Sequence, residues 1–155
     1  MYYIIGDIGN TSTKICLLNK SKILKSVIFN TKKIFLRGFV KRILNKFFIK
    51  NLRKEILFSC VVPTALKNIK KILKKTNYNV LEIKKFDLKK LIKINIKNLN
   101  QLGSDRIVNS IESKKFNNCL IIDFGTATTF DIVIHGIYEG GVIAPGVKSS
   151  KQNLS

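Results

Sequence analysis

Two stretches of the chain combine an aspartate, a glycine and several hydroxyl side chains. Residues 4–14 read IIGDIGNTSTK, and residues 121–129 read IIDFGTATT. In each stretch an apolar strand leads into the aspartate, and the turn that follows can donate backbone N–H groups and hydroxyls to phosphate oxygens. A carboxylate repels a phosphate unless a cation lies between them, so the pattern predicts a nucleotide bound with a metal ion. The structural alternative is a tight turn between antiparallel strands, and the repetition of the pattern favours the phosphate site.

A third candidate lies in residues 102–116 (LGSDRIVNSIESKKF), where apolar residues recur at helical spacing. We expect Ser104 to cap this helix, which places Asp105 and Arg106 in its first turn. An aspartate at that place complements the helix dipole. The adjacent pair can also act on a substrate, because the carboxylate can accept a hydroxyl proton and the guanidinium can bind a carboxylate.

Acidic residues are scarce in this chain, which makes their positions informative. The chain has 9 acidic and 29 basic residues, and Asp7, Asp105, Asp123 and Asp131 lie in or beside the three segments. We expect each of these four to be required individually. The single histidine, His135, falls in a predicted turn between strands, and we interpret it as a surface residue because the sequence places no partner near it.

The net charge of +20 would ordinarily indicate nucleic acid or an anionic membrane as a partner. The basic residues are 25 lysines and 4 arginines, and the lysines are spread through every segment. A nucleic-acid surface should favour arginine and should cluster its charge. We therefore expect no specific nucleic acid and no membrane among the partners.

The length and the cysteines bound the class of protein. A chain of 155 residues with 45% hydrophobic residues corresponds to about one domain with a packed core. Cys16, Cys60 and Cys119 lie in or beside apolar runs without metal-ligand spacing, which predicts buried free thiols in a reducing compartment. The sequence shows no secretory leader pattern and no apolar run of membrane-spanning length, so we expect a soluble cytoplasmic protein.

The apolar pattern predicts an α/β chain of order β-β-β-α-β-α-β, followed by a helix and further strands. The first part has predicted strands at residues 2–6, 13–18, 22–29, 55–62 and 79–83 and predicted helices at 34–49 and 65–75. Residues 86–100 lack clear periodicity and are predicted to form a connecting loop. The helix at 102–116 is followed by predicted strands at 119–123 and 128–134, a turn at 135–139 and the segment GGVIAPG at 140–146.

Four segments, taken in order, resemble the motifs of type III pantothenate kinases, which belong to the acetate and sugar kinase/Hsc70/actin superfamily. They are Asp7-Ile8-Gly9-Asn10-Thr11 with Lys14, Gly103-Ser104-Asp105-Arg106, Asp123-Phe124-Gly125-Thr126-Ala127-Thr128-Thr129 and Gly140-Gly141-Val142-Ile143-Ala144-Pro145-Gly146. The resemblance extends over essentially the whole chain. It implies a ribonuclease H-like, actin-like α/β domain with a mixed β-sheet flanked by helices.

The resemblance also implies an activity and roles for the motif residues. The activity is ATP-dependent phosphorylation of pantothenate to 4'-phosphopantothenate, the first step of coenzyme A biosynthesis, by a homodimer that uses Mg2+ and a monovalent cation, K+ or NH4+. Asp105 would be the catalytic base, and Asp123 would bind the monovalent cation. The residues that would contact pantothenate are Gly103, Ser104, Asp105 and Arg106. Those that would bind ATP are Asp7, which would also lie near Mg2+, with Ile8, Gly9, Asn10, Thr11, Ser12, Thr13, Lys14 and Thr126.

Two features depart from the family pattern. The family carries a Y-x-x-P-x-x-L-G run where this chain has Ile96, Leu99 and Leu102, so a substrate-contacting tyrosine is missing. In the family, the last motif leads into a second actin-like domain, which completes the ATP cleft, supplies a substrate-contacting threonine and forms much of the dimer interface. We therefore assign residues 1–146 to an N-terminal actin-like ATPase domain and residues 147–155 to the start of a missing second domain, where Lys148 replaces a residue that tends to be apolar.

Three hypotheses follow for the function of the chain. The first is a pantothenate kinase by descent, active if another chain supplies the rest of the site. The second is a truncated, catalytically inactive remnant that acts at most as a binding or dimerisation module, marked by exposed core surface. The third is a basic nucleic-acid-binding protein, marked by steeply salt-dependent binding to any oligonucleotide.

Overall fold

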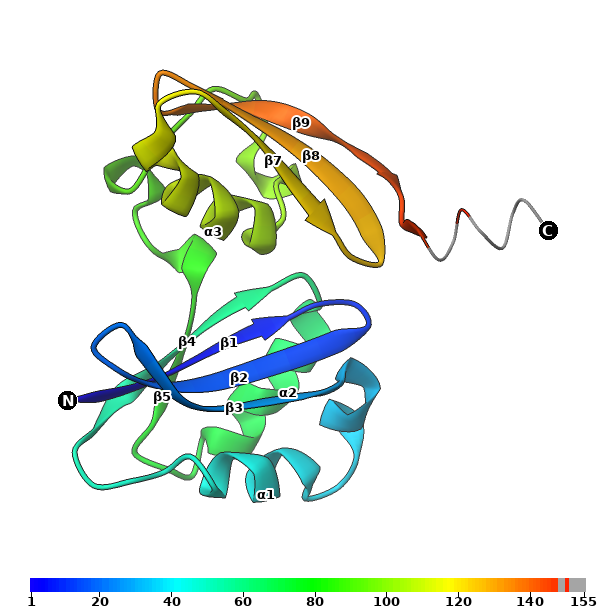
Figure 1. Cartoon of the computed structure of the whole chain (residues 1–155). Helices are drawn as coiled ribbons and strands as arrows, with labels where there is room; N and C mark the ends of the chain where they lie inside the picture. Colours follow the sequence, from blue (N-terminus) through cyan, green and yellow to red (C-terminus); the bar gives the residue numbers. More distant parts are fainter. Residues whose placement is uncertain (148–149, 151–155) are drawn as a thin grey trace. The chain divides into compact units, whose positions relative to one another are not determined.

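The computed structural model describes residues 1–147 and 150, and it divides the chain into two compact units, Met1–Lys85 and Phe86–Ser155. Figure 1 shows that each unit has its own β-sheet with helices against it. The segment 147–155, predicted to begin a second domain, lies largely outside the described residues, and so does Lys148. In the part of the chain that is described, no helix is both long and apolar enough to cross a membrane.

The first unit contains a five-stranded mixed sheet of strand order β3-β2-β1-β4-β5. Strands β1, β2 and β3 form an antiparallel meander, whereas β4 pairs parallel to β1 and β5 parallel to β4. The elements are β1 (Tyr2–Ile8), β2 (Ser12–Asn19), β3 (Lys22–Asn30), the 3-10 helix η1 (Thr31–Phe35), α1 (Phe39–Asn45), β4 (Leu52–Cys60), α2 (Pro63–Leu73), β5 (Asn79–Glu82) and the 3-10 helix η2 (Ile83–Lys85). The predicted order β-β-β-α-β-α-β is confirmed.

The core of the first unit lies between one face of this sheet and the two helices. Alternation along β1 puts Ile4 and Ile8 on the same face, and both are fully buried. They pack in one cluster with Ile15 of β2, Leu44 of α1 and Ile69 of α2. The other face of β1 carries Asp7, the polar residue next to the last position of the strand, and Asp7 is exposed.

The helix predicted at residues 34–49 is wrong in its extent. The structure has a 3-10 helix at Thr31–Phe35 and a separate α-helix at Phe39–Asn45. Gly38 lies between them with φ of +74°, a left-handed conformation that an α-helix cannot contain and that glycine adopts without strain. The apolar spacing that predicted one helix therefore continues across the point where one helix ends and the next begins.

The second unit contains a four-stranded sheet of order β6-β9-β8-β7. Strands β7, β8 and β9 form an antiparallel meander, and the short β6 pairs parallel to β9. The elements are the 3-10 helix η3 (Leu88–Lys90), β6 (Lys93–Ile94), the 3-10 helix η4 (Leu99–Gln101), α3 (Ser104–Ser113), the 3-10 helix η5 (Lys114–Phe116), β7 (Cys119–Phe124), β8 (Ala127–Ile134) and β9 (Ile137–Pro145). The region predicted as a loop thus holds two short helices and a two-residue strand.

Two local predictions in this unit are corrected. Gly103, not Ser104, is the N-cap of α3, because Gly103 has the extended backbone of a cap while Ser104 is already helical and fully buried. The turn between β8 and β9 is shorter than predicted, since β9 begins at Ile137 and includes most of the GGVIAPG segment. His135 lies in that turn with φ of +51°, and its backbone N–H donates to Asn118 Oδ1 at 2.8 Å, so its predicted place in a turn is confirmed.

The three cysteines are free thiols, with Cys16 and Cys60 buried and Cys119 half-buried.

Candidate active site

The first part of the candidate site is the β1–β2 hairpin. Strand β1 continues through Ile8 and β2 begins at Ser12, so the loop is limited to residues 9–11 and is shorter than the predicted loop at 7–12. Asp7 pairs in register with Lys14 of β2 and with Ser59 of β4. Directly opposed residues point to the same face of a sheet, so this row places an ammonium and a hydroxyl on either side of the carboxylate.

The predicted ATP-binding residues of this hairpin differ in how far they are exposed to solvent. Asp7, Asn10, Thr11, Ser12 and Lys14 are exposed and present a carboxylate, an amide, hydroxyls and an ammonium to solvent. Ile8 and Thr13 are fully buried, so they can offer a ligand only their backbone groups. Gly9 is half-buried and closes the turn, because its N–H donates to the Ser12 carbonyl at 3.0 Å.

A threonine outside the predicted set supports the loop from behind. The Thr31 hydroxyl donates to the Gly9 carbonyl at 2.7 Å, and its backbone N–H donates to the Thr11 carbonyl at 2.9 Å. The hydroxyls of Thr13 and Thr31 lie 2.9 Å apart, and both residues are buried. Sequence analysis missed Thr31, whose one signal is its place directly after β3, where pairing of Ser12 with Asn30 brings that strand beside the loop.

The chemistry of this face fits a nucleotide phosphate with its divalent cation. The Ser59 hydroxyl next to Asp7 is buried and has no hydrogen-bond partner among the described residues, which is unusual for a buried polar atom. No group of three His, Cys, Asp or Glu side chains among the described residues is placed to hold a metal ion. Mg2+ in kinases is bound by one or two carboxylates together with the phosphates of the nucleotide, so a single exposed aspartate beside a hydroxyl-rich loop suits it.

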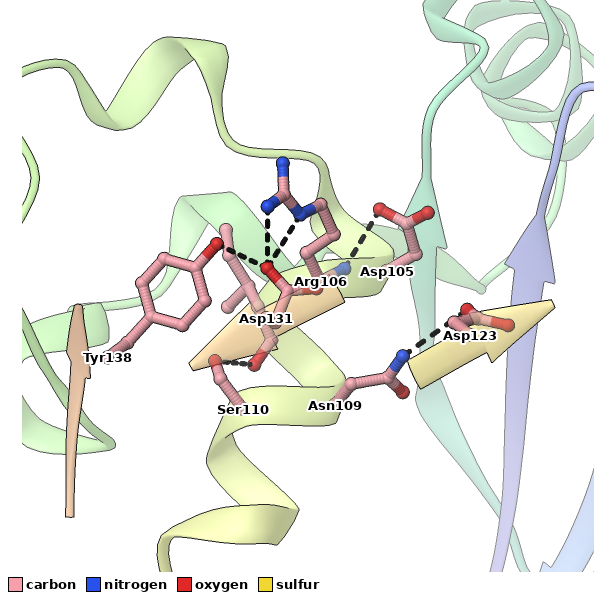
Figure 2. Close-up of polar contacts among 8 residues, drawn as sticks. Asp105, Arg106, Asn109, Ser110, Asp123, Asp131 and Tyr138 are labelled. Carbon is pink, nitrogen blue, oxygen red and sulfur yellow. Dashed lines mark hydrogen bonds and ion pairs between the residues drawn. The ribbon is translucent and has the colours of Figure 1, made fainter. Parts of the chain in front are cut away.

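The second part of the candidate site is the N-terminal turn of α3. Asp105 lies in this turn, is half-buried, and its Oδ1 accepts a hydrogen bond from the Arg106 N–H at 2.9 Å. One turn further along, Asn109 Nδ2 donates to Asp123 Oδ2 over 3.4 Å (Figure 2). Helix α3 therefore carries the predicted base, Asp105, and also contacts the predicted cation ligand, Asp123, through Asn109.

The Arg106 side chain forms a buried ion pair. Its Nε and Nη2 both donate to Asp131 Oδ1, at 2.8 and 2.6 Å, and the Tyr138 hydroxyl donates to the same oxygen at 2.6 Å (Figure 2). Asp131 is 0% exposed, Tyr138 1% and Arg106 8%. The second oxygen, Asp131 Oδ2, is buried and has no partner in the described part of the chain.

Charge and burial fix the protonation states of this cluster. Burial lowers the pKa of the Arg106 guanidinium, but the hydrogen bonds and negative charge of Asp131 outweigh it, so the pKa of Arg106 is raised overall. Burial, followed by the hydrogen bond to Asp131, raises the pKa of the Tyr138 phenol well above its ordinary value. Tyr138 is therefore a neutral donor at physiological pH, and the cluster holds one cation and one anion.

The second glycine of the GGVIAPG segment is required by the backbone of β8 and by this ion pair. A Cβ atom on Gly141 would lie 2.0 Å from the Phe130 carbonyl oxygen, 2.7 Å from Arg106 Nη2 and 2.8 Å from Asp131 Oδ1. No side chain fits at such distances without displacing backbone. Two of the predicted motif segments thus meet at Asp131, because one supplies Arg106 and the other supplies the glycine that leaves room for the ion pair.

The loop between β7 and β8 is the remaining predicted element. Asp123 is exposed at the end of β7, and Thr126 is exposed in the two-residue loop, where the Gly125 N–H donates to the Ala127 carbonyl at 3.0 Å. An open cavity of about 340 Å3 lies beside Asp123 and is lined by Asn109, Glu112, Ser113, Ile121, Ile122 and Asp123. Carboxylate and amide oxygens are ligands suited to hard cations, and Asp123, Glu112 and Asn109 bring such oxygens to the lining of this cavity.

Comparison with known proteins decides the family. The profile of the family described as type III pantothenate kinase matches residues 3–155. The chain belongs to the type III pantothenate kinase family. It is 47% identical to the type III pantothenate kinase of Pelagibacter ubique, over 98% of this chain and 62% of that protein. The chain spans 60–62% of the length of three curated relatives that it matches in sequence.

Solved structures show the same fold at low sequence identity. The ethanolamine utilization protein EutJ from Carboxydothermus hydrogenoformans aligns with a TM-score of 0.55 at 9% identity, over 100% of this chain and 58% of that one. The Ppx/GppA phosphatase of Aquifex aeolicus, in its type II variant, aligns with a TM-score of 0.53 at 10% identity, over 99% and 55%. The predicted actin-like α/β fold with mixed sheets and flanking helices is confirmed.

Proposed function

We propose that this chain carries the ATP-phosphate and pantothenate parts of an ATP-dependent pantothenate kinase, which forms 4'-phosphopantothenate in the first step of coenzyme A biosynthesis. The observation that carries the proposal is the family match over residues 3–155, within which all four predicted motifs are present in order. Phosphoryl transfer depends on positioning and on neutralising charge more than on covalent chemistry. The residues of the two units include groups that can position the reactants and groups that can neutralise charge.

In this proposal, the β1–β2 hairpin binds the phosphates of ATP. The exposed side chains of Asn10, Thr11 and Ser12 and the backbone N–H groups of the loop donate to phosphate oxygens. Lys14 adds a positive charge. Asp7 would hold Mg2+, which would neutralise negative charge on the phosphates during transfer of the γ-phosphoryl group. Thr31 keeps the loop in this shape, because it binds the backbone on both sides of Asn10.

The N-terminal turn of α3 binds and activates pantothenate. Asp105 accepts the proton of the primary hydroxyl while that oxygen forms a bond to the γ-phosphorus and the bond from phosphorus to the ADP oxygen breaks. Arg106 binds the carboxylate of pantothenate, with Gly103 and Ser104 shaping the turn. Asp123 holds the monovalent cation and Thr126 contacts ATP, as the family resemblance implies. A homodimer in the cytoplasm is part of the same proposal.

The second candidate function is a binding or dimerisation module without catalysis. It is favoured by a specific observation, the apolar outer face of the second sheet, where Leu120, Ile122, Phe124, Ile132 and Val142 are all exposed. Large exposed apolar surface is typical of protein interaction sites. This candidate predicts a folded chain that associates but does not phosphorylate pantothenate.

The deciding experiment measures pantothenate phosphorylation by the purified chain with ATP, Mg2+ and either K+ or NH4+. Asp105→Asn should lower the rate by about 10²–10⁴-fold, as expected for a general base, while leaving the chain folded. Asp87→Asn is the matched control, since Asp87 is in the same unit, is exposed and pairs with Lys90 at 3.6 Å as its one ion pair among the described residues. A folded chain with no activity above the Asp105→Asn background would refute the kinase proposal and favour the non-catalytic module.

A further inference from the structure

The Asp131 carboxylate holds Arg106 in an asymmetric way. All three donors that reach Asp131 converge on Oδ1, two of them from the Nε and Nη2 edge of one guanidinium. A symmetric fork would instead place one nitrogen on each carboxylate oxygen. Here a single oxygen takes the whole edge, and Oδ2 has no partner among the residues described.

This arrangement leaves the third guanidinium nitrogen for another ligand. Figure 2 shows that Nη1 points away from Asp131, on the side opposite to the two hydrogen bonds. Arg106 is still 8% exposed although its carboxylate partner is completely buried. The side chain is therefore fixed along one edge, and the N–H groups of Nη1 at the opposite corner have no hydrogen-bond partner within the described part of the chain.

The fixation of Arg106 comes from fold elements outside the helix that carries it. Asp131 belongs to β8, 25 residues away in sequence, and its carboxylate is placed by a strand of the sheet. Gly141 of β9 leaves the space that Nη2 and Oδ1 occupy, since a Cβ there would lie within 2.8 Å of both atoms. An arginine held in this way loses little side-chain freedom when it binds a ligand, because its geometry is already set.

We propose that Asp131 is a positioning residue that sets substrate specificity, holding the Nε and Nη2 edge of Arg106 so that the Nη1 corner selects a substrate bearing a carboxylate. The inference rests on the proposed function, because it concerns how the pantothenate site recognises its ligand. Asp131 does not touch the substrate and acts only through Arg106. Nothing in the motif pattern assigns this role, since Asp131 lies beyond the last residue of the DFGTATT segment.

The test compares two ligands that differ at the recognised group. Pantothenate carries the carboxylate, and panthenol carries a hydroxyl in its place. Affinities of the full chain for each ligand are measured by calorimetry in the presence of Mg2+ and a non-hydrolysable ATP analogue. We expect the wild-type chain to prefer pantothenate by about tenfold or more, the value of one charge-assisted hydrogen bond, and Asp131→Asn to abolish the preference.

The matched control is Tyr138→Phe, which removes a hydrogen bond to the same Asp131 oxygen and leaves both bonds from Arg106 in place. If Asp131 mattered only for stability, both variants would lose stability and both would keep the preference for pantothenate. A loss of preference in Asp131→Asn alone supports the positioning role. Retention of the preference in a folded Asp131→Asn chain overturns it and leaves the proposed function standing.

A second measurement uses the wild-type chain and does not depend on a variant that folds. The side-chain Nε–H of Arg106 is followed by NMR during titration with pantothenate. The proposal predicts that the Nε–H resonance stays protected from solvent exchange while the Nη resonances shift. Loss of Nε–H protection on binding would show that Arg106 leaves Asp131 and would overturn the proposal. A wild-type chain that binds neither ligand would overturn the proposed function together with this inference.

Discussion

The two β-meanders of the chain share a sequence signature but are stabilised in different ways. In the first, β1–β2–β3, the face toward the helices is apolar, with Ile4, Ile8 and Ile15 fully buried. In the second, β7–β8–β9, the face toward α3 carries Thr129 and Asp131, both buried. The inner face of the first meander is therefore stabilised by apolar packing. The inner face of the second meander depends on the ion pair between Asp131 and Arg106 of α3.

The outer faces of the two sheets also differ. The pairing of Leu120 with Ile132, and of Ile122 with Phe130 and then Val142, joins apolar residues from all three strands of the second meander on one face. Phe124 and Val142 are 71% and 65% exposed. The corresponding face of the first sheet carries Asp7 and Lys14 at the end beside the β1–β2 loop. The comparison shows that one local motif is compatible with opposite distributions of polar residues across a sheet.

The largest expected effect comes from removing the anion of the second meander. Asp131→Ala leaves the Arg106 charge buried without its partner, so we expect the free energy of unfolding of this unit to fall by about 3–5 kcal/mol. Urea unfolding followed by hydrogen exchange at β8 amides measures it. Asp123→Ala is the control, because that carboxylate is exposed and should change stability by no more than about 0.5 kcal/mol. Equal losses in both variants would show that the ion pair is not what stabilises the second meander.

The apolar core of the first meander should respond to a cavity. Ile8→Ala removes a side chain that is 0% exposed, and we expect a loss of about 2–5 kcal/mol in the first unit. Ile122→Ala removes the same group from the outer face of the second sheet, where Ile122 is 44% exposed, and should cost much less. Denaturant titrations of both variants, read by amide exchange in each unit, test this. A similar cost at both positions would contradict the assignment of buried and outer faces.

The hydroxyl support of the first loop should have an intermediate effect. Thr31→Val leaves the Gly9 carbonyl without its donor and the Thr13 hydroxyl without its partner. A lost hydrogen bond of this kind costs about 1–3 kcal/mol, and the Gly9 amide should exchange faster with solvent. Thr31→Ser keeps the hydroxyl and should preserve slow exchange at Gly9. Unchanged exchange in Thr31→Val would show that the loop does not need this support.

The smallest effect on stability, and the largest on association, is expected at the outer face of the second sheet. Val142→Lys places a charge on an exposed position, so the free energy of unfolding should change by no more than about 0.5 kcal/mol. Self-association, measured by sedimentation velocity, should decrease because apolar surface drives it. Leu24→Lys on the first unit is the control, since Leu24 is 49% exposed. An equal decrease in both variants would mean that the outer face of the second sheet contributes no more to self-association than the exposed surface of the first unit.

The sequence predicted the fold well where local patterns determine it. Period-two alternation located the strands of the first meander, and β1, β2 and β3 are found where expected. The helix at 34–49 failed because apolar spacing does not report a left-handed glycine such as Gly38. The motif glycines and aspartates were recognised as site residues, but their roles as base, metal ligand and nucleotide contact stay predictions.

The contacts that sequence analysis missed are long-range ones. Arg106 was predicted to face a substrate, and its ion pair with Asp131 depends on how α3 packs on β8, which no local pattern encodes. The scarcity of acidic residues did single out Asp131, without indicating its partner. Thr31 supports a loop about twenty residues earlier in the chain, and a lone threonine after a strand carries no comparable signal.

The crowding at Gly141 has a consequence for how this protein family can diverge. A side chain at position 141 would meet the Phe130 backbone carbonyl at 2.0 Å, so replacing Arg106 or Asp131 by a smaller residue does not make room for it. Losing either charge of that pair alone strands the other in the interior. Substitutions at positions 106 and 131 should therefore arise together across evolutionary lineages, whereas position 141 should stay glycine even where that pair changes. The second glycine of GGVIAPG is then dictated by the backbone of the neighbouring strand β8, and the charged pair beside it is inherited as a set of two positions.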